Sequence, residues 1–174
     1  MGLAAELGYD HRPPHAVHRL VQSVAASKPG AWAFARLSPP LDRWAFRVSD
    51  GRWTLASAVS GLPVIMLTTM GAKSGKPRTS PLVGIPFEGD LAVVGSGYGQ
   101  PRTPGWVFNC WASPTGEVRY RDAAVRVRVE EPSDPSPIWS AAEALYPGYA
   151  RYPGRVEREI AVFVLRSLTE AGEA

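Results

Sequence analysis

The first third of the chain has the hydrophobic period of helices. Residues 17–24 carry apolar side chains at positions i, i+3, i+4 and i+7, and a Lys-Pro-Gly sequence ends this stretch. Residues 41–48 repeat the pattern after two prolines, and residues 54–61 form a last such segment with a threonine at its start and a glycine at its end. Residues 1–61 are therefore predicted to form a helical N-terminal extension.

Two arrangements of this extension stay open, and they are compatible with each other. The helices can pack as a layer on the body of the protein, or the face that bears Arg43, Trp44 and Arg47 can lie on a membrane surface. The longest apolar run, residues 62–67, is far below the roughly 18 residues that a membrane span needs. We therefore expect no transmembrane helix.

From residue 62 onward the apolar positions change to the period of strands. Prolines at both ends of residues 82–87 are typical of an edge strand. We predict strands over residues 63–69, 82–87, 91–96 and 161–165, a hairpin over 117–130 that turns at Asp122-Ala123 and has one solvated face, and helices over 105–112 and 136–146. This order predicts an α+β fold, with N-terminal helices followed by a mostly antiparallel sheet that is curled or closed into a barrel.

Composition and charge exclude several classes of protein. With 174 residues, of which 45% are hydrophobic and 20% charged, the chain is long enough for one globular core. Its single cysteine, Cys110, cannot form an internal disulfide and is expected to be a buried structural thiol, which favours a cytoplasmic protein, with peripheral contact to the inner face of the cell membrane if the extension lies on lipid. A net charge of +3 is too small to indicate a nucleic-acid partner.

The common catalytic and cofactor motifs are incomplete. Residues 71–76 look like a P-loop, but the two glycines are one residue too close, and Pro77 stands where a magnesium-binding Ser or Thr is needed. Residues 95–99 lack the correctly placed third glycine of a dinucleotide fingerprint. The three histidines, His11, His15 and His18, have helical spacing, but Pro13 and Pro14 break the helix that would align them, so no metal site is expected. Without paired carboxylates or a Ser-His-Asp pattern, we expect the protein not to supply its own nucleophile.

One short segment has the residue types of an anion site. The connection between the first two predicted strands contains Lys73, Ser74, Lys76, Arg78 and Thr79 within seven residues. Backbone N–H groups, hydroxyls and cations in such a turn could all point at one phosphate. An exposed basic hairpin without a ligand is the alternative.

Four motifs occur in order and at characteristic separations. They are Leu-Thr-Thr-Met-Gly-Ala-Lys-Ser-Gly-Lys-Pro-Arg-Thr-Ser-Pro-Leu at residues 67–82, Val-Gly-Ser at 94–96, Pro-Gly-Trp-Val-Phe-Asn at 104–109 and Tyr-Pro-Gly-Tyr-Ala-Arg-Tyr at 146–152. Together they resemble the deazaflavin-dependent nitroreductase family, in the subgroup A of flavin/deazaflavin oxidoreductases that uses coenzyme F420. The resemblance implies a split β-barrel, related to that of flavin mononucleotide (FMN) oxidases, with residues 62–168 as the deazaflavin-binding domain.

The resemblance also implies which residues bind the coenzyme. The phosphodiester and oligoglutamate tail would lie on the basic turn, the deazaflavin ring would lie along two strand ends, and Trp106 and Asn109 would close the pocket. The implied cofactor-binding residues are Ala72, Lys73, Ser74, Arg78, Thr79, Ser80, Pro81, Leu82, Val83, Gly95, Ser96, Gly97, Trp106 and Asn109. The family often has a basic residue at the position of Ala72 and in some members an aromatic residue at that of Val83.

The activity implied by the resemblance is hydride transfer from reduced coenzyme F420 to an electron-poor acceptor, such as a quinone or a nitro compound. Ser96 and Tyr149 are the catalytic candidates, since each can hydrogen-bond an acceptor oxygen. Tyr146, Tyr149 and Tyr152 would form an aromatic lid over the substrate, although Tyr146 suits core packing equally well. An FMN-dependent enzyme of the same fold and a non-enzymatic F420-binding or carrier protein are the alternatives. No feature of the chain indicates its oligomeric state.

Overall fold

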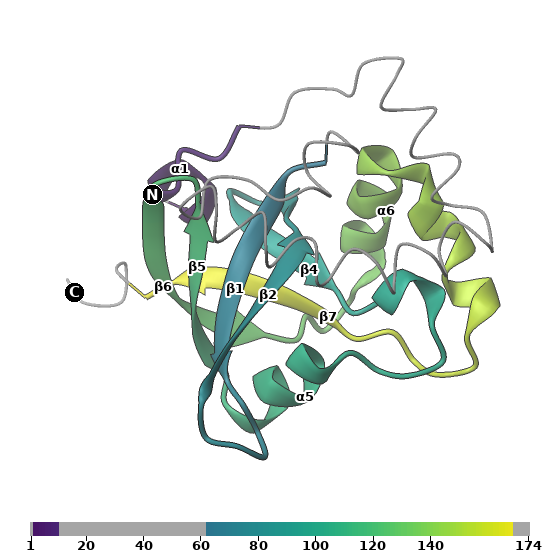
Figure 1. Cartoon of the computed structure of the whole chain (residues 1–174). Helices are drawn as coiled ribbons and strands as arrows, with labels where there is room; N and C mark the ends of the chain where they lie inside the picture. Colours follow the sequence, from purple (N-terminus) through teal and green to yellow (C-terminus); the bar gives the residue numbers. More distant parts are fainter. Residues whose placement is uncertain (1, 11–61, 169–174) are drawn as a thin grey trace.

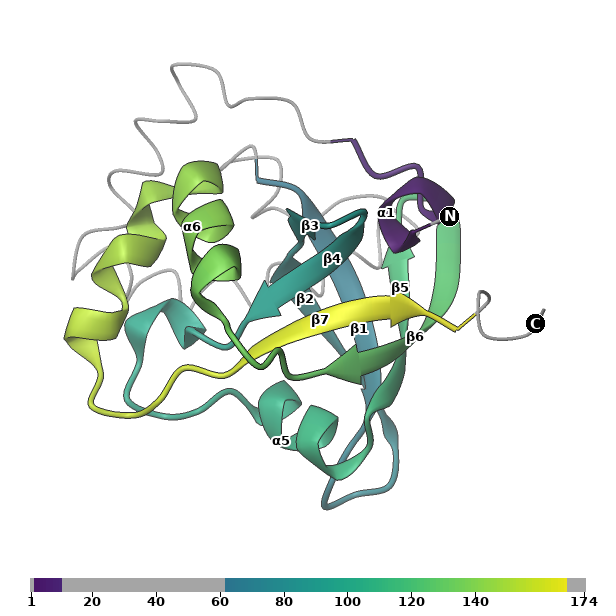
Figure 2. The same cartoon turned by 180° about the vertical axis from the view of Figure 1, so that it is seen from behind.

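The computed structural model describes residues 2–10 and 62–168, and this part of the chain is built on one strongly curled antiparallel sheet (Figures 1 and 2). Its strands are β1 (Val64–Met70), β2 (Pro77–Val83), β3 (Ile85–Phe87), β4 (Asp90–Val94), β5 (Thr115–Tyr120), β6 (Ala123–Glu130) and β7 (Val162–Ser167). The helical elements are α1 (Leu3–Glu6), α5 (Gly105–Ala112), α6 (Ser136–Leu145) and the 3-10 turns η1 (Gly97–Gly99), η2 (Pro147–Arg151) and η3 (Pro153–Arg155). The predicted α+β fold around a barrel-like antiparallel sheet is confirmed. The helices predicted over residues 17–61 lie outside the described residues.

The last strand joins the two parts of the sheet. The strand order is β2-β1-β5-β6-β7-β4-β3, so β7 lies between β6 and β4 and pairs antiparallel with both. Without β7, the described strands would form two separate sheets. None of the helices in the described residues is long and apolar enough to cross a membrane.

Two details of the predicted strands were wrong. Residues 82–87 form parts of two strands, because β2 begins at Pro77 and ends before Gly84. The start of β2 was missed because its first residues are polar and exposed, which gives no hydrophobic alternation. The hairpin turns at residues 121–122 and not at Asp122-Ala123, since Tyr120 pairs with Ala123 and Arg121 has a φ of +53°.

The predicted edge position of residues 82–87 is confirmed, because both strands to which these residues belong lie at an edge of the sheet. β2 and β3 are the two edges of the sheet, and they contain Pro81 and Pro86. A proline is tolerated there because an edge strand leaves part of its backbone without a ladder partner. β3 turns into β4 through Glu88 and Gly89, both with positive φ, as a tight hairpin requires.

The core consists of two hydrophobic clusters on opposite faces of β4 and β7. Side chains of one parity point into the curled sheet, where α1 and α5 contribute further residues, and side chains of the other parity pack with α6. The first set includes Leu91, Val93, Phe163 and Leu165, and the second includes Ala92, Val94, Val162 and Val164. Burial on both faces explains why residues 91–94 and 162–165 are continuous apolar runs.

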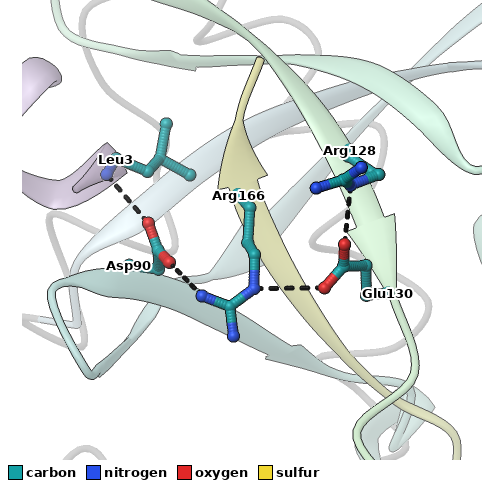
Figure 3. A network of polar contacts seen from close by, with 5 residues as sticks. All are labelled: Leu3, Asp90, Arg128, Glu130 and Arg166. Carbon is teal, nitrogen blue, oxygen red and sulfur yellow. Dashed lines mark hydrogen bonds and ion pairs between the residues drawn. The ribbon is translucent and has the colours of Figure 1, made fainter. Parts of the chain in front are cut away.

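The N-terminal residues pack directly on the sheet. Leu3 is fully buried in the first cluster, and its backbone N–H donates to Asp90 Oδ1 at 2.9 Å (Figure 3). The other carboxylate oxygen of Asp90 accepts from Arg166 Nη1 at 2.8 Å, and Arg166 Nε donates to Glu130 Oε2 at 3.1 Å. This network, extended by an ion pair between Glu130 and Arg128, links α1, β4, β7 and β6.

Replacing Asp90 by Ala should lower the free energy of unfolding by roughly 2 kcal/mol, because Leu3 N–H and Arg166 both lose a charged acceptor in a mostly buried position. Urea denaturation followed by circular dichroism measures the change. Arg126 is exposed on the solvated face of β6, so Arg126→Ala should change stability by at most about 0.5 kcal/mol. An equal effect of the two substitutions would contradict this role of Asp90.

Candidate functional site

The connection between β1 and β2 is a tight turn with its polar side chains outside. Gly71 N–H donates to the Lys76 carbonyl oxygen at 2.9 Å, and Gly75 N–H donates to the Gly71 carbonyl oxygen at 2.8 Å. Gly75 has a φ of +60°, which glycine adopts without strain. A Cβ at Gly71 would lie 2.5 Å from Ser74 Oγ and 3.1 Å from the Lys76 carbonyl oxygen, so a larger residue would displace the Ser74 side chain and crowd the turn.

Helix α5 holds this turn through Asn109. Its Oδ1 accepts from the Ala72 N–H at 3.0 Å, while its Nδ2 donates to Thr69 Oγ1 at 3.2 Å. Both ends of the amide are therefore occupied by the end of β1 and the turn that follows. In both views of the fold, α5 lies beside this end of the β1–β2 hairpin (Figures 1 and 2). Asn109 thus fixes the turn against the helix.

The turn and α5 form the walls of an open pocket of about 970 Å³. It is lined by Gly71, Ala72, Lys73, Ser74, Arg78, Thr79, Ser80, Gly105, Trp106, Phe108, Asn109, Trp111 and Ala112. Eight of the cofactor-binding residues implied by the sequence are among them: Ala72, Lys73, Ser74, Arg78, Thr79, Ser80, Trp106 and Asn109. None of the described residues that line this pocket is acidic, so its polar groups suit an anion.

One wall of the pocket is cationic and hydroxyl-bearing, and the other is aromatic. Thr79 Oγ1 lies 2.8 Å from Thr68 Oγ1 on the neighbouring strand, which links β1 and β2 at the pocket. On α5, the rings of Phe108 and Trp111 pack edge to face at 5.5 Å, and each residue is 50% exposed. Neither residue is predicted from the sequence to have a role in the site. Their i, i+3 spacing on a helix that buries Trp106, Val107 and Cys110 is the signal that could have identified them.

The remaining implied ring-binding residues lie outside this pocket. Pro81, Leu82 and Val83 continue β2 beyond it and are partly buried, with Leu82 packed on the first core cluster and Val83 on the second. Residues 95–97 follow β4 directly, and Ser96 is buried with 8% of its surface exposed. The amide of Gly95 donates to the Ala161 carbonyl oxygen at 2.8 Å, which extends the pairing of β4 with the start of β7.

The three tyrosines form a buried ladder after α6. The Tyr146 and Tyr149 rings meet edge to face at 5.8 Å, and those of Tyr149 and Tyr152 at 5.5 Å. All three belong to the second hydrophobic cluster, so the packing role considered for Tyr146 is present for each of them. Burial raises the pKa of Tyr146 above its ordinary value, which outweighs the opposing effect of its hydrogen bond with Tyr152.

Tyr9 from the N-terminal segment was not among the predicted site residues. Its hydroxyl donates to the Gly84 carbonyl oxygen just beyond β2, and its ring packs on Tyr120 at 4.9 Å. Burial raises the pKa of Tyr9, and the charges that Tyr120 and Tyr149 would carry add to this effect. Tyr9 therefore stays protonated as a hydrogen-bond donor that supports the end of β2.

Cys110 lies on the buried face of α5. Burial raises the pKa of its thiol to about 12, so the thiolate that would act as a nucleophile is not populated near neutral pH. The expected buried structural thiol is confirmed.

Comparison with known proteins places these observations in a family. Residues 41–167 match the family described as F420H(2)-dependent quinone reductase. Over 127 residues the chain is 33% identical to F420H(2)-dependent quinone reductases of Mycobacterium tuberculosis strains CDC 1551 / Oshkosh and ATCC 25618 / H37Rv, an alignment that covers 69% of this chain and 83% of theirs.

Solved structures agree with this relationship. The structure of an F420-H2 dependent reductase, FDR-A, is 37% identical with a TM-score of 0.53 and covers 59% of this chain and 93% of its own. Another, described as a domain-swapped dimer, is 32% identical with a TM-score of 0.56 and covers 79% of this chain and 99% of its own. The split β-barrel that the resemblance implied is thus confirmed.

Replacing Asn109 by Ala should release the Ala72 amide from its acceptor and accelerate its hydrogen exchange by roughly threefold to tenfold. Exchange followed by NMR measures this effect without any ligand. Asn109→Asp keeps an oxygen acceptor at the same place and should preserve most of the protection. The Gly95 amide, which bonds to Ala161, serves as an internal control and should not change. Unchanged exchange at Ala72 in Asn109→Ala would show that Asn109 does not hold the turn.

Proposed function

Because the chain belongs to the family of F420H(2)-dependent quinone reductases, we propose that it binds reduced coenzyme F420 and reduces a quinone. When bound, the coenzyme supplies the hydride, and the protein supplies binding, orientation and hydrogen bonds. The observation that carries this proposal is the pocket between the β1–β2 turn and α5, in which cations and hydroxyls converge without an acidic residue among the described lining residues. Such a donor set fits a phosphodiester followed by several carboxylates.

The cationic wall would hold the charged part of the coenzyme. The Arg78 guanidinium can donate two parallel hydrogen bonds to a phosphate or carboxylate, and Lys73 adds a mobile positive charge. Ser74 and Thr79 contribute hydroxyls on the same wall. Because Lys73, Ser74, Arg78 and Thr79 are all exposed in the structure, a long anionic tail can reach them from solvent.

The end of β2, which leads out of the pocket from Ser80, and the segment after β4 would hold the ring. Residues 80–83 of β2 and residues 95–97 after β4 are the two segments concerned, with Trp106 and Asn109 at the pocket between the turn and α5. The burial of Ser96 supports this assignment, because a hydroxyl shielded from water interacts more strongly with a polar group of a ligand than an exposed one does.

Hydrogen bonds to the acceptor oxygen would come from Ser96 and Tyr149, with Tyr146 and Tyr152 completing an aromatic lid. When a quinone receives a hydride, negative charge develops on one of its oxygens. A hydroxyl positioned beside that oxygen therefore stabilises the transition state more than the ground state. This role needs no acid/base pair with perturbed pKa values. Nitro compounds would be reduced by the same arrangement, and the aromatic residue that some family members have at the position of Val83 is missing here.

Two other functions are weighed against this one. An FMN enzyme of the same fold would need a site for a single phosphate and would leave part of the cationic wall without a use. A non-enzymatic carrier of F420 would bind the coenzyme and not turn it over. Contact of the N-terminal extension with a membrane stays a prediction, since residues 11–61 lie outside the described part of the chain.

Titration with oxidised F420 should quench tryptophan fluorescence with a Kd in the micromolar range, while FMN should bind much more weakly. The double substitution Lys73→Ala and Arg78→Ala should weaken F420 binding by roughly 100-fold, because two charge-assisted contacts of about 1.5 kcal/mol or more are lost. The double substitution Arg119→Ala and Arg126→Ala, at two exposed positions of the β5–β6 hairpin that do not line the pocket, is the control with equal loss of charge. Preference for FMN, or binding that ignores the double substitution, would contradict the assignment of this pocket.

Anaerobic mixing with F420H2 and a soluble menaquinone analogue should oxidise the coenzyme at catalytic protein concentrations. Ser96→Ala and Tyr149→Phe should each lower kcat/KM by about tenfold or more, because each removes one hydrogen bond to the developing oxygen charge. Ser140→Ala, on the exposed side of α6, should leave the rate unchanged. Tight coenzyme binding with no oxidation by any quinone would favour the carrier.

A further inference from the structure

The guanidinium of Arg158 packs against the backbone of the loop that follows β4. Its Nη2 donates to the carbonyl oxygens of Ser96 at 3.0 Å and Gly95 at 3.1 Å, and more weakly to that of Gln100 at 3.4 Å. Nε also reaches the Gln100 carbonyl oxygen at 3.4 Å, and Nη1 reaches that of Glu159 at 3.3 Å. Its hydrogen-bond partners within the described residues are thus backbone carbonyls, and desolvation lowers its pKa.

These contacts determine which way the loop amides face. In a trans peptide the N–H points opposite to the preceding C=O, and the described chain has no cis peptide bond. With the Gly95 and Ser96 carbonyls turned toward Arg158, the N–H groups of Ser96 and Gly97 must point away from it. Arg158 therefore presents two backbone donors on the opposite side of the loop.

The loop has little freedom to adopt another path. Gly97 has a φ of +54° and Gly99 a φ of +73°, and η1 is closed by hydrogen bonds from Gly99 N–H to the Ser96 carbonyl and from Gln100 N–H to the Gly97 carbonyl. A Cβ at Gly95 would lie 2.9 Å from Val107 Cγ2 and 3.1 Å from the Ala161 carbonyl oxygen. The Ser96 carbonyl accepts from both Gly99 and Arg158, so Arg158 and the turn share one anchor.

We infer that Arg158 is a positioning residue for the proposed reaction: it orients residues 95–97 so that the Ser96 hydroxyl and the Ser96 and Gly97 amides can face the redox-active ring. This inference rests on the proposed function in so far as residues 95–97 line that ring. The residue acts through the loop and not on the reacting atoms. Arginine suits this role because Nη2 bonds the Gly95 and Ser96 carbonyls while Nε and Nη1 bond those of Gln100 and Glu159. A lysine has a single nitrogen and cannot keep all of these contacts.

The variants Arg158→Ala and Arg158→Lys test the inference, with Arg126→Lys as the matched control on the solvated hairpin. Both Arg158 variants should oxidise F420H2 at least roughly tenfold more slowly in single-turnover experiments, because small displacements of positioning groups cost about that much or more. The Kd for F420 should change by less than about threefold, because the charged tail binds at Lys73 and Arg78 on the other side of the site. Guanidinium at millimolar, non-denaturing concentration should partly restore the rate of Arg158→Ala and should not affect Arg158→Lys.

Amide exchange gives a readout that needs no coenzyme. Gly99 and Gln100 should exchange faster in both Arg158 variants, while Gly75 in the β1–β2 turn should not change. Wild-type exchange rates together with a wild-type oxidation rate would overturn the inference, and so would a lower rate caused only by weaker coenzyme binding. If the wild-type protein neither binds nor oxidises F420H2, the proposed function fails, and with unchanged exchange at Gly99 and Gln100 the role of Arg158 fails as well.

Discussion

The insertion of β7 between β4 and β6 is the constraint on which the rest of this structure depends. It joins strands that are far apart in sequence, and it is stabilised by apolar burial on both faces of β4 and β7 and by Arg166, which binds Asp90 on β4 and Glu130 on β6 (Figure 3). Asp90 also accepts the Leu3 N–H, so the same carboxylate anchors the N-terminal segment. Closing the sheet at its last strand is a non-local step. The contacts of β7 stabilise the fold only after most of the chain has been ordered, because they join segments far apart in sequence.

This closure also determines where the binding segments lie. Each segment that we assign to the coenzyme is held through its backbone by a side chain from elsewhere: the turn at Ala72 by Asn109, the end of β2 at Gly84 by Tyr9, and the loop after β4 by Arg158. Backbone atoms held in this way keep their orientation when a ligand binds, and orientation is what a protein supplies when a cofactor carries the hydride. Arg158 lies four residues before the start of β7 at Val162, so the closure of the sheet and the shape of the proposed site are linked.

The polar and the aromatic residues of the pocket come from two different elements. The β1–β2 turn provides exposed cations and hydroxyls, and α5 provides aromatic rings together with the amide that holds the turn. The tyrosines after α6 lie in the second hydrophobic cluster and not along this pocket. Their packing and a role as lid are compatible, because a buried phenol keeps its proton and remains a hydrogen-bond donor. The raised pKa of Tyr146 is an example of this effect.

Local sequence patterns determined most of the strands, the two long helices of the described part, the prolines at the sheet edges and the composition of the anion turn, because each depends on residues close together in the chain. The motifs also determined the family. Tertiary structure alone decided the rest. Leu3 lies in a short N-terminal segment without a long hydrophobic pattern, and it is fully buried against the sheet. Arg158 stands between two exposed glutamates, a pattern typical of a solvated surface, yet it holds the loop after β4. The physical reason is that these side chains bind partners 60 or more residues away in the sequence. Closure of the sheet brings such partners together, and the local hydrophobic pattern contains no information about that closure.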